Sequence, residues 1–194
     1  MRKTIVALSV VFAYIIAVSS ALLAGQAGDA APQYAKRTNL IRPTDYREWV
    51  FVSSGLGMTY DNGRPSAAPS FGNVFVNPSS YRAFMRTGKW PDRTIFILEI
   101  RASGGEASIN KAGRFQTSLA GVEAEVKDSR FPDGWAFFNF GRGGSLIDTA
   151  EPLPASEGCV ECHTKNTAVE RTFVQFYPTL MEVARRMGTV KPNF

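Results

Sequence analysis

At 194 residues, with 44% hydrophobic and 20% charged residues, the chain has the length and apolar content of one domain with a hydrophobic core. Its formal net charge is +5, and the basic residues are scattered singly along the sequence rather than clustered. Proteins that bind nucleic acid show a basic patch or stripe, so we expect no nucleic-acid partner.

The N-terminus has the features of a secretory signal. A basic start is followed by an apolar run over residues 4–24 and then by small residues. We predict a signal peptide over residues 1–30, with cleavage near residues 27–30, followed by a single domain over residues 31–194. The apolar run is also close to the length that spans a bilayer, so an uncleaved membrane anchor is the alternative. In both cases the folded part is exported, and we predict a periplasmic protein.

The first half of the chain alternates between predicted helices, a loop and a strand. Turn-forming residues separate four segments: a helix over residues 44–54, a loop over residues 61–70, a strand over residues 72–76 and a helix over residues 79–87. The second helix has the clearest ends, since Asn77 and Pro78 are suited to start it and Gly88 to stop it.

The middle of the chain is rich in β-prone residues. Three strands are predicted, over residues 94–101, 122–126 and 135–141. In the second of them, Val122, Ala124 and Val126 alternate with charged residues, so one face is buried and the other wet. This alternation places Glu123 and Glu125 on the solvent side, and we expect no acid–base role for them.

Residues 159–163, Cys-Val-Glu-Cys-His, contain both cysteines and the one histidine of the chain. Random placement would give this arrangement roughly once in 20,000 sequences, and C-x-x-C-H is the attachment signature of haem c. Cys159 and Cys162 would each form a thioether with a haem vinyl group, and His163 would bind the iron as proximal ligand. We therefore predict one covalently attached haem c per chain.

Cysteine and histidine side chains also serve in zinc sites and in redox or structural disulfides. A zinc site needs four ligands, and the chain has no further cysteine or histidine to complete one. A redox dithiol or a small disulfide would also use the C-x-x-C spacing. Neither of these last two explains the adjacent His163.

The chain ends in one more predicted helix, which Pro178 starts and Gly188 stops. Its apolar side is formed by Leu180, Met181, Ala184 and Met187. The order of elements predicts the α+β class: an antiparallel β-sheet with flanking helices, and the haem c motif in the C-terminal helical part.

A sixth ligand to the iron would have to be a methionine, a lysine or the N-terminus, because no second histidine exists. Met181 and Met187 have the spacing of helix-core residues, and Met85 belongs to a short amphipathic helix. Met58, beside Gly57, is the methionine for which a role as sixth ligand is least excluded. A vacant iron face next to apolar side chains binds or activates small molecules rather than only carrying electrons.

After the signal, nearly the whole chain resembles the cytochrome P-460 superfamily, which includes the cytochromes c′-beta. The segments that carry the resemblance are YREWVFV, FGNVFVNPSSYRAF, KWPDRTIFILEI, RFPDGWAFFNFG and CVECH followed by NTAVERTFVQFYPTL. The resemblance implies a homodimer built from large antiparallel sheets, with a five-coordinate haem c whose proximal ligand is His163. It also implies an open opposite face for small nitrogen ligands.

The two branches of the superfamily differ in one covalent bond. Cytochromes P-460 oxidise hydroxylamine and carry a bond from a lysine to the porphyrin rim, whereas cytochromes c′-beta lack this bond and bind nitric oxide or carbon monoxide. In the P-460 pattern, the lysine lies two residues beyond a phenylalanine on the strand that follows a W-P-D turn. Here the phenylalanine is Phe96, and Leu98 takes the place of the lysine. The other lysines after the signal lie in polar or turn segments or, like Lys127, alternate outward.

The same resemblance suggests which residues form the distal pocket. Phe96 and Leu98, which alternate to one side of their strand, are candidates for its wall. The c′-beta relatives cap the iron with phenylalanines, so Phe75 and Phe71 are further candidates. Three functions follow: a gas-binding cytochrome for nitric oxide or carbon monoxide, a hydroxylamine oxidoreductase that reduces a soluble cytochrome, and a six-coordinate electron carrier. The first is preferred because of Leu98. If the protein is an enzyme, it is an oxidoreductase acting on hydroxylamine or nitric oxide.

Overall fold

The computed structural model describes residues 30–59, 68–143 and 145–194. The predicted signal peptide lies outside the described residues except at its end, and the predicted loop over residues 61–70 lies largely outside them. Residues 31–194 form one compact unit. Among the described residues, no helix is long and apolar enough to cross a membrane.

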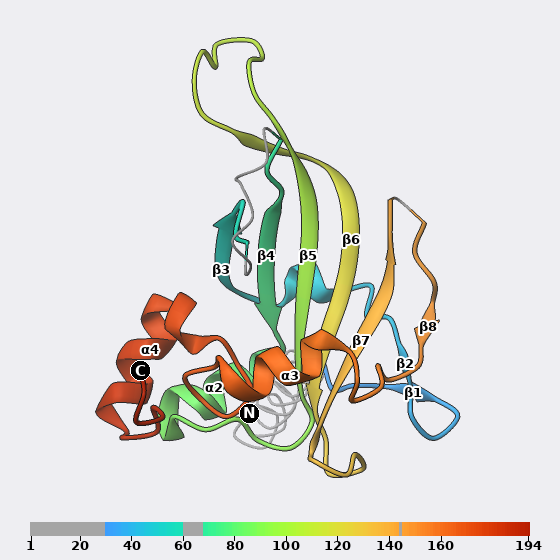
Figure 1. Ribbon diagram of the computed structural model, residues 1–194, viewed down its shortest axis with the longest axis vertical. Coiled ribbons are helices and arrows are strands. Elements are labelled where there is room, and N and C mark those ends of the chain that lie inside the picture. Colours follow the sequence, from blue (N-terminus) through green and yellow to red (C-terminus); the bar gives the residue numbers. More distant parts are fainter. Residues whose placement is uncertain (1–29, 60–67, 144) are drawn as a thin grey trace, which may run out of the picture. The chain divides into compact units, whose positions relative to one another are not determined.

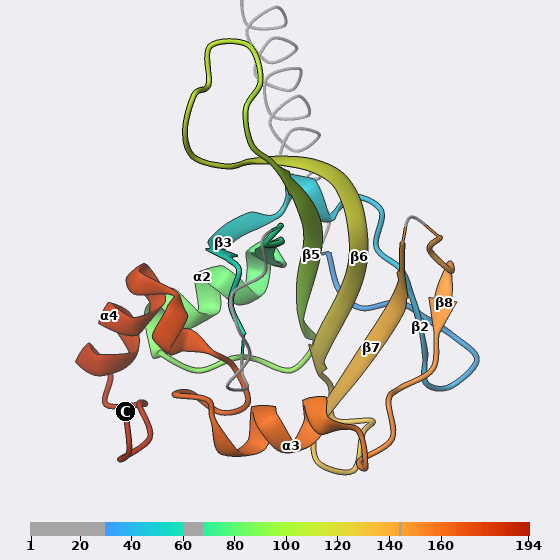
Figure 2. The ribbon, with the colours of Figure 1, turned by 45° about the horizontal axis from the view of Figure 1, so that its top comes forward.

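The centre of this unit is a five-stranded antiparallel sheet in which the strands follow one another in sequence order (Figure 1). Its strands are β3 (Val50–Leu56), β4 (Phe71–Val76), β5 (Thr94–Gly104), β6 (Phe115–Lys127) and β7 (Trp135–Arg142). A second, three-stranded sheet lies beside β7 (Figure 2). Its strands are β1 (Tyr34–Ala35), β2 (Asn39–Ile41) and β8 (Thr149–Ala150).

In the described part of the chain, three α-helices and two short 3-10 helices complete the fold. They are η1 (Tyr46–Glu48), α2 (Pro78–Thr87), α3 (Gly158–Lys165), η2 (Val174–Phe176) and α4 (Pro178–Arg186). α2 and α4 pack against each other, and α3 lies across the sheet next to β7 (Figure 1). The prediction of an α+β fold with an antiparallel sheet and flanking helices is confirmed.

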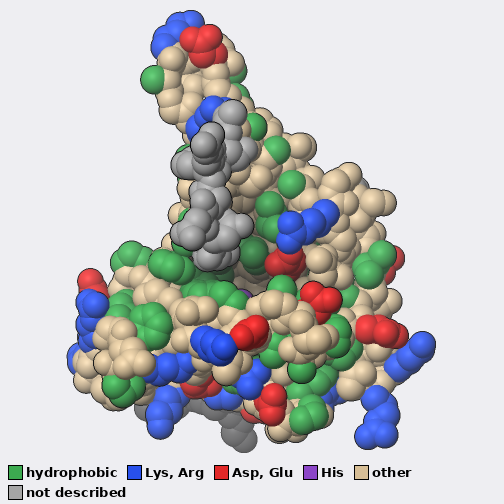
Figure 3. Space-filling view, in the orientation of Figure 1, with side chains coloured by type: hydrophobic (Ala, Val, Ile, Leu, Met, Phe, Trp, Pro, Cys, Tyr) green, Lys and Arg blue, Asp and Glu red, His purple; other side chains and the backbone are tan. Residues whose placement is uncertain are grey.

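The register of the strands defines two faces of the large sheet. Phe96 lies opposite Val76 on β4 and opposite Glu125 on β6, and Glu125 lies opposite Phe137 on β7. Paired residues project to the same side, so these four residues share one face, which we call the α3 face. Figure 3 shows this face hollowed where the sheet rises above α3, with hydrophobic side chains and charged side chains of both signs around the hollow.

Helices cover only part of the α3 face. The covered part is a hydrophobic core of residues from the sheet, from α2 and from α4: Val76, Phe84, Trp90, Phe96, Ala168, Val169, Val174, Tyr177, Leu180, Met181, Val183 and Ala184. Val74 and Leu98, further along the same face, are only half-buried. Among the described residues, the helices therefore leave the part of the α3 face around Val74 and Leu98 only half-buried, and we call this part the open half of the α3 face.

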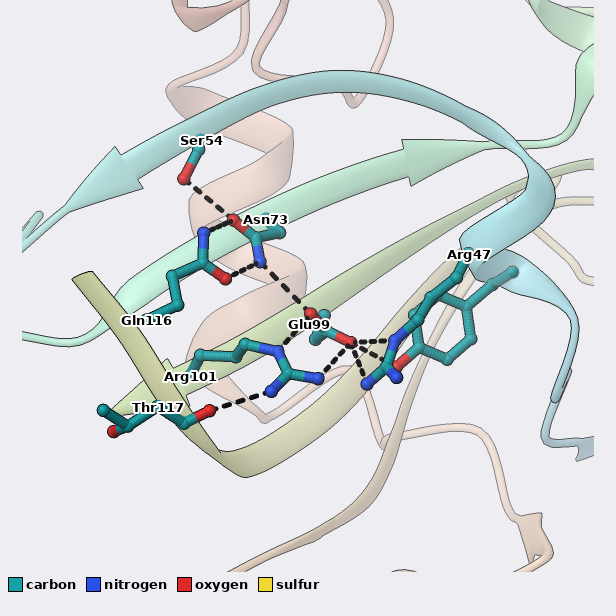
Figure 4. Close-up of polar contacts among 8 residues, drawn as sticks. Arg47, Ser54, Asn73, Glu99, Arg101, Gln116 and Thr117 are labelled. Carbon is teal, nitrogen blue, oxygen red and sulfur yellow. Dashed lines mark hydrogen bonds and ion pairs between the residues drawn. The ribbon is translucent and has the colours of Figure 1, made fainter. Parts of the chain in front are cut away.

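The opposite face of the sheet holds a buried carboxylate, Glu99, which is 2% exposed (Figure 4). It accepts hydrogen bonds from the Tyr46 hydroxyl at 2.6 Å, from Arg47 Nε at 2.8 Å and from Arg101 Nε at 2.7 Å. Asn73 Nδ2 donates to it as well, at 3.1 Å. These bonds outweigh the effect of burial and lower the pKa of Glu99 to about 2. The cluster thereby ties η1 to the middle of the sheet.

One sequence prediction about the fold is wrong. Residues 44–54 do not form a helix, because only Tyr46–Glu48 is helical, as η1, and Val50–Leu56 is the edge strand β3. The run Val50-Phe51-Val52 favours a strand, since β-branched and aromatic side chains fit a pleated sheet. The bonds of Tyr46 and Arg47 to Glu99 hold the preceding turn in a geometry that cannot continue as an α-helix.

The other predicted elements are found with shifted ends. α2 starts at Pro78 and stops at Gly88, whose φ of 66° is the left-handed conformation expected of a terminating glycine. Asn77 does not cap the helix with its side chain; its Oδ1 accepts a hydrogen bond from the backbone N–H of Ile95 instead. The strand predicted over residues 122–126 is the end of the much longer β6.

Candidate haem site

Both cysteines lie on α3, and both are free thiols. Cys159 is exposed and Cys162 is half-buried. Residues three apart on a helix lie on neighbouring positions of its surface, so α3 presents the two sulfur atoms one turn apart and places His163 directly after the second. Burial and the nearby Glu123 carboxylate raise the pKa of the Cys159 thiol. This keeps the sulfur protonated in the free chain.

The imidazole of His163 is held between two aromatic rings on the α3 face. The ring centroid of Phe137 on β7 lies 4.6 Å away, and that of Phe173 lies 4.5 Å away on the segment after α3. Nδ1 of His163 donates a hydrogen bond to the backbone carbonyl of Arg171 at 2.8 Å. A proton on Nδ1 leaves the lone pair of Nε2 free, which is the state that binds a metal ion.

The chain after α3 folds into a turn that presents the Arg171 carbonyl. Thr167 Oγ1 donates to the carbonyl of His163 at 2.6 Å and lies 3.0 Å from the carbonyl of Glu170. Glu170 has a φ of 50°, an unfavourable conformation for a residue with a side chain. Its carboxylate accepts a hydrogen bond from Lys127 Nζ at 2.6 Å, and this ion pair helps to hold the turn in place.

Glu125 lies beside His163, which corrects the prediction that it faces solvent. Its Oε1 is 3.4 Å from Nδ1 of His163, and its side chain is only 11% exposed. Burial raises the pKa of Glu125, although His163 opposes this effect. In turn, burial would lower the pKa of His163, but the Glu125 carboxylate and the Arg171 carbonyl outweigh burial, and the pKa of His163 lies above its usual value.

The open half of the α3 face next to this histidine is mainly apolar. Val74 on β4 and Leu98 on β5 are paired across the strands, and both are half-buried. A Cβ atom at Gly72 would lie 3.2 Å from Cδ1 of Leu98. The glycine thus leaves room that any other residue would fill. One charged pair also lies here, because Glu123 on β6 is directly opposite Leu98 and is paired with Arg142.

A model of the Cytochrome P460 family matches residues 43–174, which is more than half of the chain. The chain belongs to the cytochrome P460 family. The match extends over the sheet, α3 and the turn that holds His163. No curated protein matches the sequence significantly.

Family membership makes this protein a haem-binding cytochrome, and the residues of the site fit a haem group. Two free thiols and the histidine share one helix, and the Arg171 carbonyl fixes the histidine proton on Nδ1. The half-buried surface of Val74 and Leu98 is of the kind that a large flat apolar group covers. The haem would therefore lie against the open half of the α3 face.

The three distal-pocket candidates do not lie together. Leu98 is on the open half of the α3 face. Phe96 is on the same face but 4% exposed, with its ring edge-on to Trp90 in the helix-covered core. Phe75 pairs with Ile97 and so projects from the opposite face, where it packs against Tyr46. Phe71 alternates to that side too. We therefore retain Leu98 and leave both Phe75 and Phe71 out of the candidate pocket.

The methionines considered as a sixth ligand also lie in different parts of the fold. Met181 is buried in the core at 7% exposure, Met85 packs against that core, and Met187 is exposed after α4. The side chain of Met58 folds over Gly55, contacting the position that a Cβ atom would occupy there. Gly55 pairs with Gly72, so Met58 lies on the α3 face. It is the methionine that the structure brings nearest to the open half.

The lysines offer no amine at the position of Leu98. Lys127 does not alternate outward as predicted, since it lies on the α3 face with its side chain 28% exposed. Its Nζ donates to the carbonyl of Trp90 at 2.7 Å and to Glu170 at 2.6 Å, so its amine is engaged. Lys191 is half-buried and donates to Thr167. The exposed lysines of the described chain are Lys36, Lys89, Lys111 and Lys165.

Proposed function

We propose that this protein is an exported mono-haem c-type cytochrome that binds a neutral diatomic gas, nitric oxide or carbon monoxide, at an open axial position of its iron. The observation that carries this proposal is the apolar, amine-free surface around Leu98 on the face that also holds His163. A haem bound there supplies an iron atom with one free coordination position for a small ligand.

Different residues of the chain would attach the haem, bind its iron, orient the imidazole and form the apolar surface. Cys159 and Cys162 would hold the group by adding their thiols across its two vinyl groups, and Nε2 of His163 would bind the iron. The Arg171 carbonyl holds the proton on Nδ1 and fixes the plane of the imidazole. Val74 and Leu98 give the open half of the face a water-excluding surface, which favours neutral ligands over ions.

Hydroxylamine oxidation with electron transfer to a soluble cytochrome is the second candidate function. In the P-460 pattern it depends on a lysine bonded to the porphyrin, and the matched position here is Leu98. A six-coordinate electron carrier is the third, and Met58 is the residue that would serve it, because it lies on the α3 face. The three functions predict different optical spectra.

The deciding experiment uses the holoprotein purified from the periplasm. Denaturing electrophoresis should leave haem stain on the protein band, and haem that runs at the dye front would contradict covalent attachment. The reduced protein should show a high-spin spectrum in the wild type and in Met58→Ala alike. A low-spin reduced spectrum that becomes high-spin in Met58→Ala would establish the electron carrier instead. A strongly red-shifted ferrous band would indicate a lysine crosslink.

A further inference from the structure

We propose that Glu125 is a positioning residue for the iron ligand: a second hydrogen-bond acceptor for Nδ1–H of His163, in competition with the Arg171 carbonyl. This inference rests on the proposed function only in taking His163 as the proximal ligand. The imidazole has one Nδ1 proton and two acceptors within reach, at 2.8 Å for the Arg171 carbonyl and 3.4 Å for Glu125 Oε1.

Glu125 Oε1 is buried and has no hydrogen-bond partner. Such an atom is destabilising, because it has lost its bonds to water and gained none from the protein. Its cross-strand neighbours are Phe96 on β5 and Phe137 on β7, neither of which carries a donor. The Nδ1–H of His163, 3.4 Å away, is therefore the donor that this oxygen can reach.

The alternative acceptors differ in what they do to the iron ligand. A backbone carbonyl is a neutral acceptor, whereas a carboxylate makes a stronger, charge-assisted hydrogen bond. A stronger bond draws the Nδ1 proton away from the ring and makes Nε2 a better electron donor to a metal. A shift of the imidazole by less than 1 Å, within the ordinary motion of a side chain, would exchange one acceptor for the other. His163 thus lies between an acceptor that forms a weaker hydrogen bond with Nδ1–H, the Arg171 carbonyl, and one that forms a stronger bond, the Glu125 carboxylate.

The surroundings of Glu125 fit this role better than a purely structural one. Glu170 and Glu123 are nearby anions, and Arg171 is the nearby cation besides the histidine. The Arg171 guanidinium is paired with Asp133 at 3.4 Å, and Glu170 is paired with Lys127. Among the described groups that face it, His163 is the partner left for Glu125.

The test compares the wild-type holoprotein with Glu125→Gln and with the control Glu161→Gln. Gln keeps the size of the side chain and removes its charge. Glu161 is an exposed carboxylate on α3, paired with Lys165, so the control removes one negative charge from the helix that carries His163. The readouts are the iron–histidine stretching frequency by resonance Raman of the reduced protein and the reduction potential. We expect Glu125→Gln to lower the frequency and raise the potential, and Glu161→Gln to leave the frequency unchanged.

An unchanged frequency and potential in Glu125→Gln would overturn the proposal, as would equal shifts in the control. If Glu125→Gln does not fold, Glu125→Asp replaces it: the shorter side chain withdraws the carboxylate from Nδ1 and should shift both readouts in the same direction. Failure of the proposed function looks different. A six-coordinate wild-type protein would contradict the open axial position, and the potentials of the three proteins would still decide the role of Glu125.

Discussion

Nδ1 of His163 donates its proton to the main-chain carbonyl of Arg171, at a distance of 2.8 Å. Because the acceptor belongs to the backbone, the orientation of the imidazole depends on the turn that presents this carbonyl rather than on the Arg171 side chain. That turn is held by Thr167, which is fully buried and whose hydroxyl bonds the carbonyl of His163 itself. One side chain thus holds both His163 and the turn that presents its acceptor.

Thr167→Val should destabilise the protein by about 1–3 kcal/mol, because the isosteric side chain leaves buried carbonyl groups without a partner. The matched control is Thr164→Val. Thr164 lies on the exposed side of α3 and bonds the carbonyl of Val160, so its loss should cost less than about 0.5 kcal/mol. Chemical denaturation of both variants measures the difference. Equal stability of the two would show that the Thr167 hydroxyl does not hold the turn.

Glu99 should make the protein sensitive to acid. Its pKa is about 2 in the folded protein against 4.5 ordinarily, so its stabilising effect is complete above pH 4.5 and is lost as the pH falls from 4.5 to 2. The loss amounts to about 1–3 kcal/mol, the lower value allowing for solvent screening at the exposed Arg47. Glu99→Gln should unfold more easily at neutral pH and should lack this part of the acid dependence. The free energy of unfolding between pH 2 and pH 6 measures both effects.

The strands could be predicted from the sequence because each carries a local signal, whereas the segment before β3 could not. The apolar residues from Trp49 to Val52 fit a helix or a strand equally well when read alone. What decides between them is Glu99, about 50 residues away, through its bonds to Tyr46 and Arg47. A contact between residues so far apart in the sequence does not change the pattern of apolar and polar residues around residue 46, so that pattern could not reveal it.

The C-x-x-C-H motif could be recognised in the sequence because its residues are adjacent in the chain, and its covalent attachment to haem stays a prediction. The position of Glu125 could not be predicted, because alternation along β6 shows which residues share a side but not what covers that side. Here the side of Glu125 is covered by His163. The sequence also could not show that Phe75 lies on the face opposite His163, for a similar reason. This phenylalanine lies on a strand with a clear pattern, but only the pairing of Phe75 with Ile97 and of Val74 with Leu98 shows which of them shares a face with His163.

Because Leu98 has no amine that could bond to the porphyrin, we expect the two thioethers to be the haem's covalent bonds to the protein. After tryptic digestion of the holoprotein, mass spectrometry should find haem on the peptide that contains Cys159 and Cys162, and none on the peptide that contains Leu98. Leu98→Lys places an amine on the open half of the α3 face, within the apolar surface beside Val74, and should generate a fraction of haem bonded to both peptides. Haem on the Leu98 peptide of the wild type would refute the assignment.

We expect a homodimer in which a second copy covers β3. This strand is at the edge of the sheet and exposes Phe51 at 55% and Leu56 at 45%. An edge strand with large exposed apolar side chains invites pairing with another chain. Light scattering of the holoprotein should give twice the chain mass, and the double variant Phe51→Lys, Leu56→Lys should give the chain mass. A monomeric wild type at micromolar concentration would contradict the expectation.

The most direct test of an open axial position on the iron is a carbon monoxide titration of the reduced holoprotein, followed by its optical spectrum. We predict rapid binding of one carbon monoxide per chain, at a rate that Met58→Ala does not change, because no protein ligand has to leave. A reduced protein that does not bind carbon monoxide would contradict this prediction. So would slow binding that Met58→Ala accelerates, because the iron would then carry two protein ligands.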